Sequence, residues 1–402
     1  MSVTTDSGDS AKVPLWNNPK FRAAVSQSLL IAILLWLGYA IISNTLRNLE
    51  EQQIASGFDF LSTTAGFGII QKLIPYNEAS SYGRAFMVGI LNTLFVSAIG
   101  VIIATLLGFT VGVMRLSKNW VISNIAYVYV EVLRNIPLLL QIIVWYGLIL
   151  GFSPDKRDKW SFFNIFHYNI SGIRSPATMA EPGFWMTGLA FILAIVGTVF
   201  LAKWSRKRQD ATGQTFPVFW ASLGVIIGLP TLVFLLTGSP MTLEHPEFVS
   251  EGPIFKRGFE LGKGAVLIPE FLAMLVALST YTAAFIAENV RAGILAVSHG
   301  QSEAAGALGL RRGQALRLIV IPQASRVIIP PLTSQYLNLT KNSSLAVGIA
   351  YPDLVAVGGT VLNQTGQAIE IIGMWMLIYL SISLATSAFM NWYNAKMALV
   401  ER

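Results

Sequence analysis

Polar and charged side chains interrupt the apolar run at residues 121–150, where they could bind or guide a charged solute. Glu131 and Arg134 are three residues apart, so on a helix they share one face and could form an ion pair. Pro137 removes a backbone hydrogen bond and disfavours helix at Ile136, so we expect a kink or break there. Carbonyl groups freed beside buried charges would suit a polar pathway. A position near the surface of a membrane, with an interfacial ion pair, fits these residues equally well.

A second polar segment, residues 341–344, interrupts the apolar run at 327–349. Polar groups at membrane depth must face protein or water, so Lys341, Asn342 and Ser344 could line a channel or serve helix packing. Both interpretations are open on physical grounds. Lys341 with Ser343 or Ser344 would also permit Ser/Lys nucleophilic chemistry, which would make the chain a membrane enzyme.

Other constellations that support catalysis or cofactor binding are missing from the sequence. There is no cysteine, which excludes disulfides and thiolate metal sites, and the three histidines are scattered in expected loops. The nearest match to a phosphate-binding loop, residues 258–264, has the wrong spacing and lacks a following Ser or Thr. We therefore expect no metal, no cofactor and no enzyme activity in this chain.

The elements that must position these residues are long enough to cross a membrane. Hydrophobic residues make up 53% of the chain and charged residues 12%, a balance far from that of a soluble domain. The continuous apolar composition of the runs favours helices over the alternating strands of a membrane barrel. A span needs roughly 20 apolar residues, and about eight runs approach that length: 25–45, 87–113, 121–150, 183–202, 217–237, 271–287, 327–349 and 371–393. The sequence predicts an all-α integral membrane protein.

Lys and Arg are concentrated in alternate connecting segments, which predicts the orientation of the chain. With the N-terminus inside, the inner segments carry an excess of positive residues, whereas acids outnumber them in 46–86, 151–182, 238–270 and 350–370. Both termini are therefore expected in the cytoplasm. This bias also accounts for the formal net charge of +7, and nucleic-acid binding is not indicated, because no soluble domain gathers the charges on one face.

Small residues form a stripe along the second run. Gly100, Ala104, Gly108 and Gly112 recur every four residues, so they lie on one helix face and let another helix approach closely. The stripe predicts a packed bundle and carries no information about a substrate.

The inner segment 288–326 contains a short exposed element. Ser302 is a candidate helix cap before the acidic Glu303, and Gly309 is suited to end the turn in the left-handed conformation. A second short helix is then expected to run to Pro322 and to expose three arginines. Such an element fits docking of a partner protein, and an ordinary solvated loop is the alternative.

The spacing in this segment resembles the EAA loop of ATP-binding-cassette (ABC) importer permeases. That pattern reads Glu-Ala-Ala, three residues, Gly, nine residues, Ile, one residue, Leu-Pro, and here only its Leu is changed, to Ile321. The resemblance implies that the matching residues couple the chain to ATPase subunits. They are Glu303, Ala304, Ala305, Gly309, Ile319 and Pro322.

Further segments resemble the polar amino-acid branch of these importers. They are 91–94, 131–141, 281–294, 299–303 and 341–345. In the last of them the family's Lys-Asp-Thr-Ser-Leu reads Lys-Asn-Ser-Ser-Leu, so the acidic side chain of the family is replaced by Asn342. The insert between the matching segments is similar to that of the larger permeases of general L-amino-acid importers.

The resemblance implies a type I importer core of about five helices, with the first span packed outside it. It divides the chain into a cytoplasmic arm at 1–24, a first transmembrane helix and periplasmic loop at 25–86, an N-terminal half of the permease core at 87–150, an insert with two extra spans at 151–270, a C-terminal half of the core at 271–393 with the coupling loop at 288–326, and a cytoplasmic tail at 394–402.

The implied function is that of a permease subunit in a bacterial inner membrane that moves amino acids, with a broad range of L-amino acids expected. Its partners would be an ATPase dimer that binds the ATP, a related second permease subunit, a periplasmic amino-acid-binding protein and the lipid bilayer. The candidates for lining the pathway are Glu131, Arg134, Lys341, Asn342 and Ser344. The alternative is an ion-coupled secondary transporter of amino acids, which would leave the EAA-like loop unexplained and usually has internal repeats that this sequence lacks.

Overall fold

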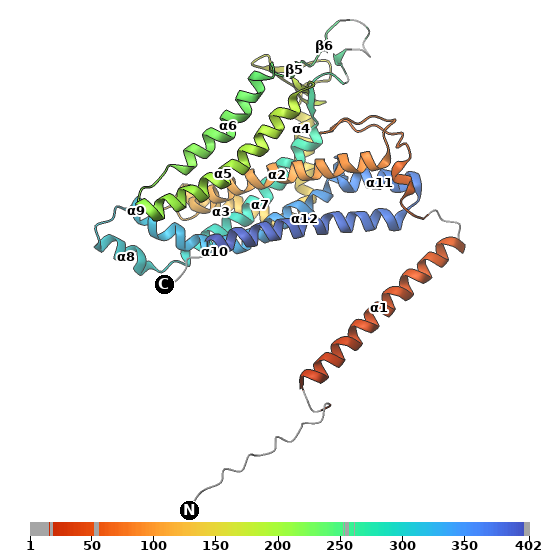
Figure 1. Cartoon of the computed structure of the whole chain (residues 1–402). Coiled ribbons are helices and arrows are strands. Elements are labelled where there is room, and N and C mark those ends of the chain that lie inside the picture. The colour runs from red at the N-terminus through yellow and green to blue at the C-terminus, as the bar shows by residue number, and fades with distance from the viewer. Residues whose placement is uncertain are drawn as a thin grey trace, which may run out of the picture.

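The computed structural model describes residue 16 and residues 19–51, 56–251, 253, 257–260 and 262–397. The expected arm at 1–24 and tail at 394–402 therefore lie partly outside the described residues. Long helices lie side by side in a bundle, and short strands gather beyond the ends of two of them (Figure 1).

The helices of the bundle are formed by two separate segments of the chain. The N-terminal segment holds α2 (Tyr82–Met114), α3 (Trp120–Asn135) and α4 (Leu138–Phe152). The C-terminal segment holds α7 (Pro269–Leu295), α8 (His299–Ala307), α9 (Arg312–Ala315), the π-helix η4 (Leu316–Val320), α10 (Ile321–Asn342), the 3-10 helix η5 (Ser343–Ile349), α11 (Leu354–Thr365) and α12 (Ala368–Met397). A short 3-10 helix, η2 (Asp59–Ser62), precedes α2.

The predicted membrane spans are present in the described residues of the chain. Seven of its helices are long and apolar enough to cross a membrane, or up to eight if α3 and α4 are counted as one broken span. The axes of α3 and α4 differ by 108° at their junction. The expected all-α membrane fold and the break near Ile136 are thus confirmed, although the run at 121–150 is two helices and not one straight span.

The small-residue stripe of α2 packs on α7, which lies at the centre of the bundle. A Cβ atom added to Gly108 would lie 2.6 Å from Ile286 Cβ, and one added to Gly112 would lie 2.8 Å from the carbonyl oxygen of Ala287. Ala104, one step earlier in the stripe, is fully buried. Glycine is required at these positions because any larger side chain would clash with α7. The close approach matters because van der Waals packing, and not exclusion of water, holds helices together in lipid.

The first helix, α1 (Pro19–Glu51), stands apart from the bundle (Figure 1). Apolar side chains such as Leu35 and Ile41 are exposed on different sides of it. The resemblance placed the span at 25–45 outside the five-helix core, and α1 lies outside the bundle of the described residues (Figure 1). The physical reason is that a helix that is apolar all round is solvated by lipid tails and gains nothing from water exclusion by packing.

The insert consists of a helix pair and a β-rich cap, and the strands of the cap were not predicted from the sequence. The pair is α5 (Phe184–Thr212) and α6 (Val218–Leu236), which pack mainly on each other. The cap has an antiparallel sheet of order β1-β2-β3-β8 and two further strand pairs, β4-β5 and β6-β7. The strands are β1 (Trp160–Phe162), β2 (Phe166–Asn169), β3 (Gly172–Ser175), β4 (Ala177–Ala180), β5 (Met241–Glu244), β6 (Phe248–Val249), β7 (Gly258–Phe259) and β8 (Ala265–Leu267).

Candidate functional site

The segment after α7 folds into an exposed element built on α8. Gly309 has a φ of +72°, and the amide of Leu310 donates to the carbonyl of Ala305 at 3.1 Å while the amide of Gly309 donates to that of Gly306 at 2.9 Å. These two bonds form a Schellman motif, which ends the helix and satisfies its last carbonyls. The predicted left-handed conformation of Gly309 is confirmed.

The outer surface of this element combines a carboxylate with apolar side chains. Glu303 has 71% of its side chain exposed and contacts His299 Nδ1 at 3.0 Å, while Leu308 is 79% exposed and Leu318 is 62% exposed. All three side chains are open to a partner that approaches this element. We name Glu303, Leu308 and Leu318 the docking surface.

Two local expectations for this element were wrong. The helix begins at His299, so Ser302 lies within it and is not its cap. The second helix also does not end at Pro322, because the π-helix η4 leads directly into α10 and Pro322 lies in the first turn of α10. Proline is tolerated there because the first turn of a helix has no intrahelical acceptor for its amides. Arg311 and Arg317 are exposed, as expected.

Of the remaining EAA-like residues, Ala305 is buried, Ile319 is half-buried, and Ala304 and Pro322 are exposed. A cavity of about 1230 Å³ lies between this element and the ends of α2 and α7. Met114 and Leu295 line it from the bundle, and Ser302 lines it from α8. The element is therefore separated from the ends of the spans by open space, which leaves room for α8 to shift.

The break between α3 and α4 is bridged by one buried side chain. Gln141 Nε2 donates to the carbonyls of Leu133 and Ile136, at 2.8 and 2.9 Å. Gln141 is only 4% exposed. The carbonyls that the sequence suggested would be free for a pathway are therefore largely taken by this amide, because an unpaired carbonyl away from water is costly.

Replacing the side-chain amide of Gln141 should destabilise the junction between α3 and α4. We expect Gln141→Leu to lower stability by about 1–3 kcal/mol, because two buried carbonyls lose their donor while the size of the side chain hardly changes. The midpoint of thermal unfolding of the purified protein measures the effect. Gln209→Leu, at an exposed site on α5, is the control for loss of an amide, and equal midpoints for the two variants would contradict the assignment.

Glu131 and Arg134 are not paired in the described residues. Arg134 lies over the ring of Phe285 on α7, with 5.1 Å between the guanidinium carbon and the ring centroid, and its side chain is exposed. The carbonyl of Glu131 accepts a hydrogen bond from Asn135 Nδ2 at 2.8 Å. The i,i+3 ion pair was a wrong expectation, because the aromatic face on the neighbouring helix offers the guanidinium a contact of comparable energy.

The second polar segment lies at the end of α10, where the helix narrows to η5. Ser344 Oγ donates to the carbonyl of Lys341 at 2.8 Å, Lys341 is exposed and Asn342 is half-buried. The hydroxyl of buried Ser343 donates to the carbonyl of Thr340, which argues against Ser/Lys nucleophilic chemistry here. No contact among the described residues joins this segment to Glu131 or Arg134.

An ion-pair cluster at the C-terminal ends of α2 and α7 was not singled out from the sequence. Glu288 accepts from Arg115, which caps α2, and from Arg291 Nη2 at 2.6 Å. Glu288 and Arg291 belong to the family-like segment 281–294, so the resemblance contained a signal for them. The cluster holds the C-terminal end of α7 in place, and α8 follows α7 in the chain.

A buried polar network at the other end of the bundle was also missed. Asn92 Nδ2 donates to the carbonyls of Gln71 and Pro352, each at 2.9 Å, and the hydroxyl of Tyr351 donates to the carbonyl of Asn92 at 3.1 Å. The amide of Leu354 donates to Thr93 Oγ1 at 3.0 Å. These bonds join α2, the loop before it and the turn between η5 and α11 into one unit.

Asp353 belongs to the same turn and caps α11 by accepting from the amide of Ala356 at 2.8 Å. Its side chain is fully buried, and burial raises the pKa of Asp353 from 3.8 to about 6. A carboxyl with a raised pKa contributes its stability below its ordinary pKa, and that contribution is lost as the pH rises through 6.

We therefore expect the permanently neutral variant Asp353→Asn, whose amide oxygen can still cap α11, to change the pH dependence of stability. Between pH 5 and 7 the unchanged protein should lose about 1 kcal/mol relative to the variant. Thermal unfolding of both proteins across this range measures the difference. Parallel pH curves would show that another group titrates.

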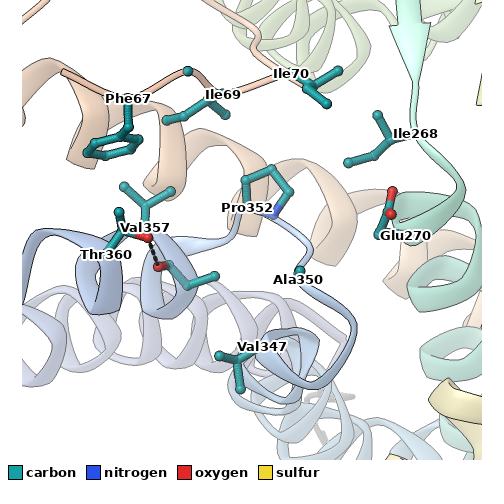
Figure 2. A pocket seen from close by; sticks show the side chains of 12 residues that line it. Phe67, Ile69, Ile70, Ile268, Glu270, Val347, Ala350, Pro352, Val357 and Thr360 are labelled. Carbon is teal, nitrogen blue, oxygen red and sulfur yellow. Dashed lines mark hydrogen bonds between the residues drawn. The ribbon is translucent and has the colours of Figure 1, made fainter. Parts of the chain in front are cut away.

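A pocket of about 390 Å³ opens beside this network (Figure 2). Phe67, Ile69 and Ile70 line it from the loop before α2, and Val357 faces them from α11. Glu270, at the start of α7, is its one acidic lining residue and accepts from the hydroxyl of Tyr146 at 2.8 Å. The pocket is thus apolar with one carboxylate at its side.

Comparison with known proteins places this architecture in a family. Residues 211–399 match the family described as binding-protein-dependent transport system inner membrane component. The general L-amino acid transport system permease protein AapQ of Rhizobium johnstonii is 50% identical, over 96% of this chain and 94% of its own length. This chain belongs to that family of permeases.

Two further relatives of the permease are similar over nearly all of their length. The putative amino-acid ABC transporter permease protein YhdX of Escherichia coli is 47% identical, over 96% of each chain. The glutamate/glutamine/aspartate/asparagine transport system permease protein BztB of Rhodobacter capsulatus is 40% identical, over 93% of the permease and 92% of its own length. The similarity extends through the insert, since each alignment covers more than nine-tenths of the chain.

Proposed function

We propose that this permease is the membrane subunit of an ABC importer that translocates amino acids, with a broad range of L-amino acids as substrates. The observation that carries the proposal is the docking surface, which an EAA-like sequence forms on a helix closed by a Schellman motif at Gly309. The substrates named for three relatives of similar length support the choice of amino acids.

The proposed assembly contains further chains that divide the work. An ATPase dimer would bind the ATP and contact the docking surface, a related permease subunit would complete the pathway, and a periplasmic binding protein would deliver the amino acid. The excess of Lys and Arg in the segments that include α8 supports an inner-membrane orientation with both termini in the cytoplasm.

The proposed mechanism is alternating access driven through α8. Glu303 would anchor the ATPase, and Gly309 would be the hinge at which α8 turns relative to α9. Because α8 follows α7 after residues 296–298 and leads through η4 into α10, a shift of α8 acts on two central spans together. The cavity behind α8 leaves space for that shift.

The proposed pathway uses the five polar residues at the break and at the end of α10. Arg134 and Lys341 would attract the carboxylate of a zwitterionic amino acid, and Glu131 would attract its ammonium group. Asn342 and Ser344 would supply neutral hydrogen bonds. The exposure of Arg134 and Lys341 in a single chain supports a pathway that is completed by a second subunit.

Uptake into liposomes tests the proposal. The complex recovered with the permease from native membranes should accumulate radiolabelled L-amino acids only with ATP beside the docking surface and binding protein on the opposite side. Accumulation by the permease alone, driven by an ion gradient without ATP, would instead establish the ion-coupled secondary transporter.

A further inference from the structure

The β1–β2 hairpin of the cap has one aromatic face. The strands pair Trp160 with Tyr168 and Phe162 with Phe166, and directly opposed residues of antiparallel strands lie on the same face. The rings of Trp160 and Tyr168 lie 5.9 Å apart. Four aromatic side chains therefore form a continuous surface along the hairpin.

The opposite face of the hairpin carries polar side chains, of which Ser161 is exposed and His167 is half-buried. Ser161 Oγ lies 2.9 Å from His167 Nδ1, and the ring of His167 lies 5.9 Å from that of Phe259, which is buried. A sheet in water places its polar face outward and its apolar face on the core. This hairpin instead leaves Trp160, Phe162 and Phe166 about half exposed, so its aromatic face is not built for water.

Among the described residues of the cap, the tip of the hairpin has the most exposed apolar side chain. Phe163 is 91% exposed and has a φ of +54°, a left-handed conformation that is unfavourable for a bulky residue. Phe162 and Ile165 beside it are about half exposed, and no charged residue occurs between positions 160 and 166. A contiguous group of exposed apolar side chains marks a surface that contacts a protein or a membrane.

The aromatic face begins at the end of a membrane helix. The hydroxyl of Tyr168 lies 2.6 Å from Ser153 Oγ, and Ser153 caps α4 directly after Phe152, which is itself exposed. Charged residues fill the short link at 155–159 between α4 and β1. Aromatic side chains beside charged groups at the end of a span have the composition of the membrane–water interface.

We propose that the β1–β2 hairpin inserts its tip and aromatic face into the headgroup region of the leaflet in which α4 ends, and so anchors the cap to lipid. Continuity with the end of α4 favours lipid over a protein partner, which would dock above the membrane surface. The inference requires only that the chain spans a membrane, and it does not depend on what the permease transports.

The absence of cysteine from the chain makes a site-specific test possible. A Phe163→Cys variant is labelled with the fluorophore NBD and reconstituted with cysteine-free partner subunits in lipid nanodiscs. Quenching is measured with lipids that carry a nitroxide near the headgroup and, separately, with iodide in the water. Phe200→Cys, midway along α5, is the lipid-facing control, and Glu251→Cys, in the cap, is the water-facing control.

We expect nitroxide to quench the label at position 163 several-fold more strongly than the label at 251, and iodide to quench it several-fold less. Ile165→Cys is a second reporter at the tip in case the first variant does not assemble. If position 163 behaves like position 251, the proposal is wrong. Shielding from iodide that arises only when the binding protein is added would also overturn it and identify a protein-docking surface.

Discussion

Charge reversal at the docking surface, Glu303→Arg, should leave the permease folded and inserted but reduce amino-acid uptake and substrate-stimulated ATP hydrolysis by at least about tenfold, equivalent to about 1.4 kcal/mol of contact energy. In the described residues of the chain the carboxylate of Glu303 bonds only to His299, and most of it is exposed. The fold therefore does not need it, whereas a partner that approaches α8 would meet a repulsive charge. Reconstituted ATPase activity and uptake measure the effect.

His299→Ala is the matched control, because it removes the intrachain partner of Glu303 and keeps the carboxylate. It should retain most of the activity. If Glu303→Arg transported normally, the ATPase contact would lie elsewhere. If it failed to reach the membrane, Glu303 would have a role in folding that its exposure contradicts.

Gly108→Leu should prevent the bundle from forming in its present arrangement. The first carbon of the new side chain would lie 2.6 Å from Ile286 Cβ and 3.0 Å from the carbonyl oxygen of Ala283, so α2 and α7 would have to separate. Overpacking costs about 1–3 kcal/mol where neighbours can adjust, and a backbone neighbour cannot. Yield of monodisperse protein and its thermal midpoint measure the loss.

The control is Gly147→Leu on α4, where an added Cβ meets nothing within 4 Å. It should be expressed and melt close to the unchanged protein. Equal stability of the two leucine variants would show that the separation of α2 and α7 is larger than in this structure.

Features set by local backbone chemistry were predictable from the sequence. Pro137 restricts itself and its predecessor, so the break could be placed to within a residue or two, and Gly309 occupies the left-handed conformation expected of it. The stripe at Gly108 and Gly112 also acts as predicted, because a spacing of four defines a helix face whatever its partner. The spans followed from length and composition alone.

Features that depend on a distant partner were not predictable. Arg134 contacts the ring of Phe285, which is far away in the chain, and not the carboxylate of Glu131. Gln141 could be seen as a polar residue in an apolar run, but its carbonyl partners exist only once the helix has bent. The strands of the cap have two to four residues each, which is too few for an alternating pattern to stand out. The roles of the coupling and pathway residues stay predictions.

The pairing of β3 with β8 has a mechanical consequence. Leu267 pairs with Ile173, and Ile268 alone separates that strand from Pro269, where α7 starts. The carbonyl of Leu267 also lies so close to Gly172 that no side chain could be placed there. We therefore expect α7 to work as a lever whose C-terminal end carries α8 and whose N-terminal end is built into a β-sheet, so that a displacement on one side of the membrane is transmitted directly to the other.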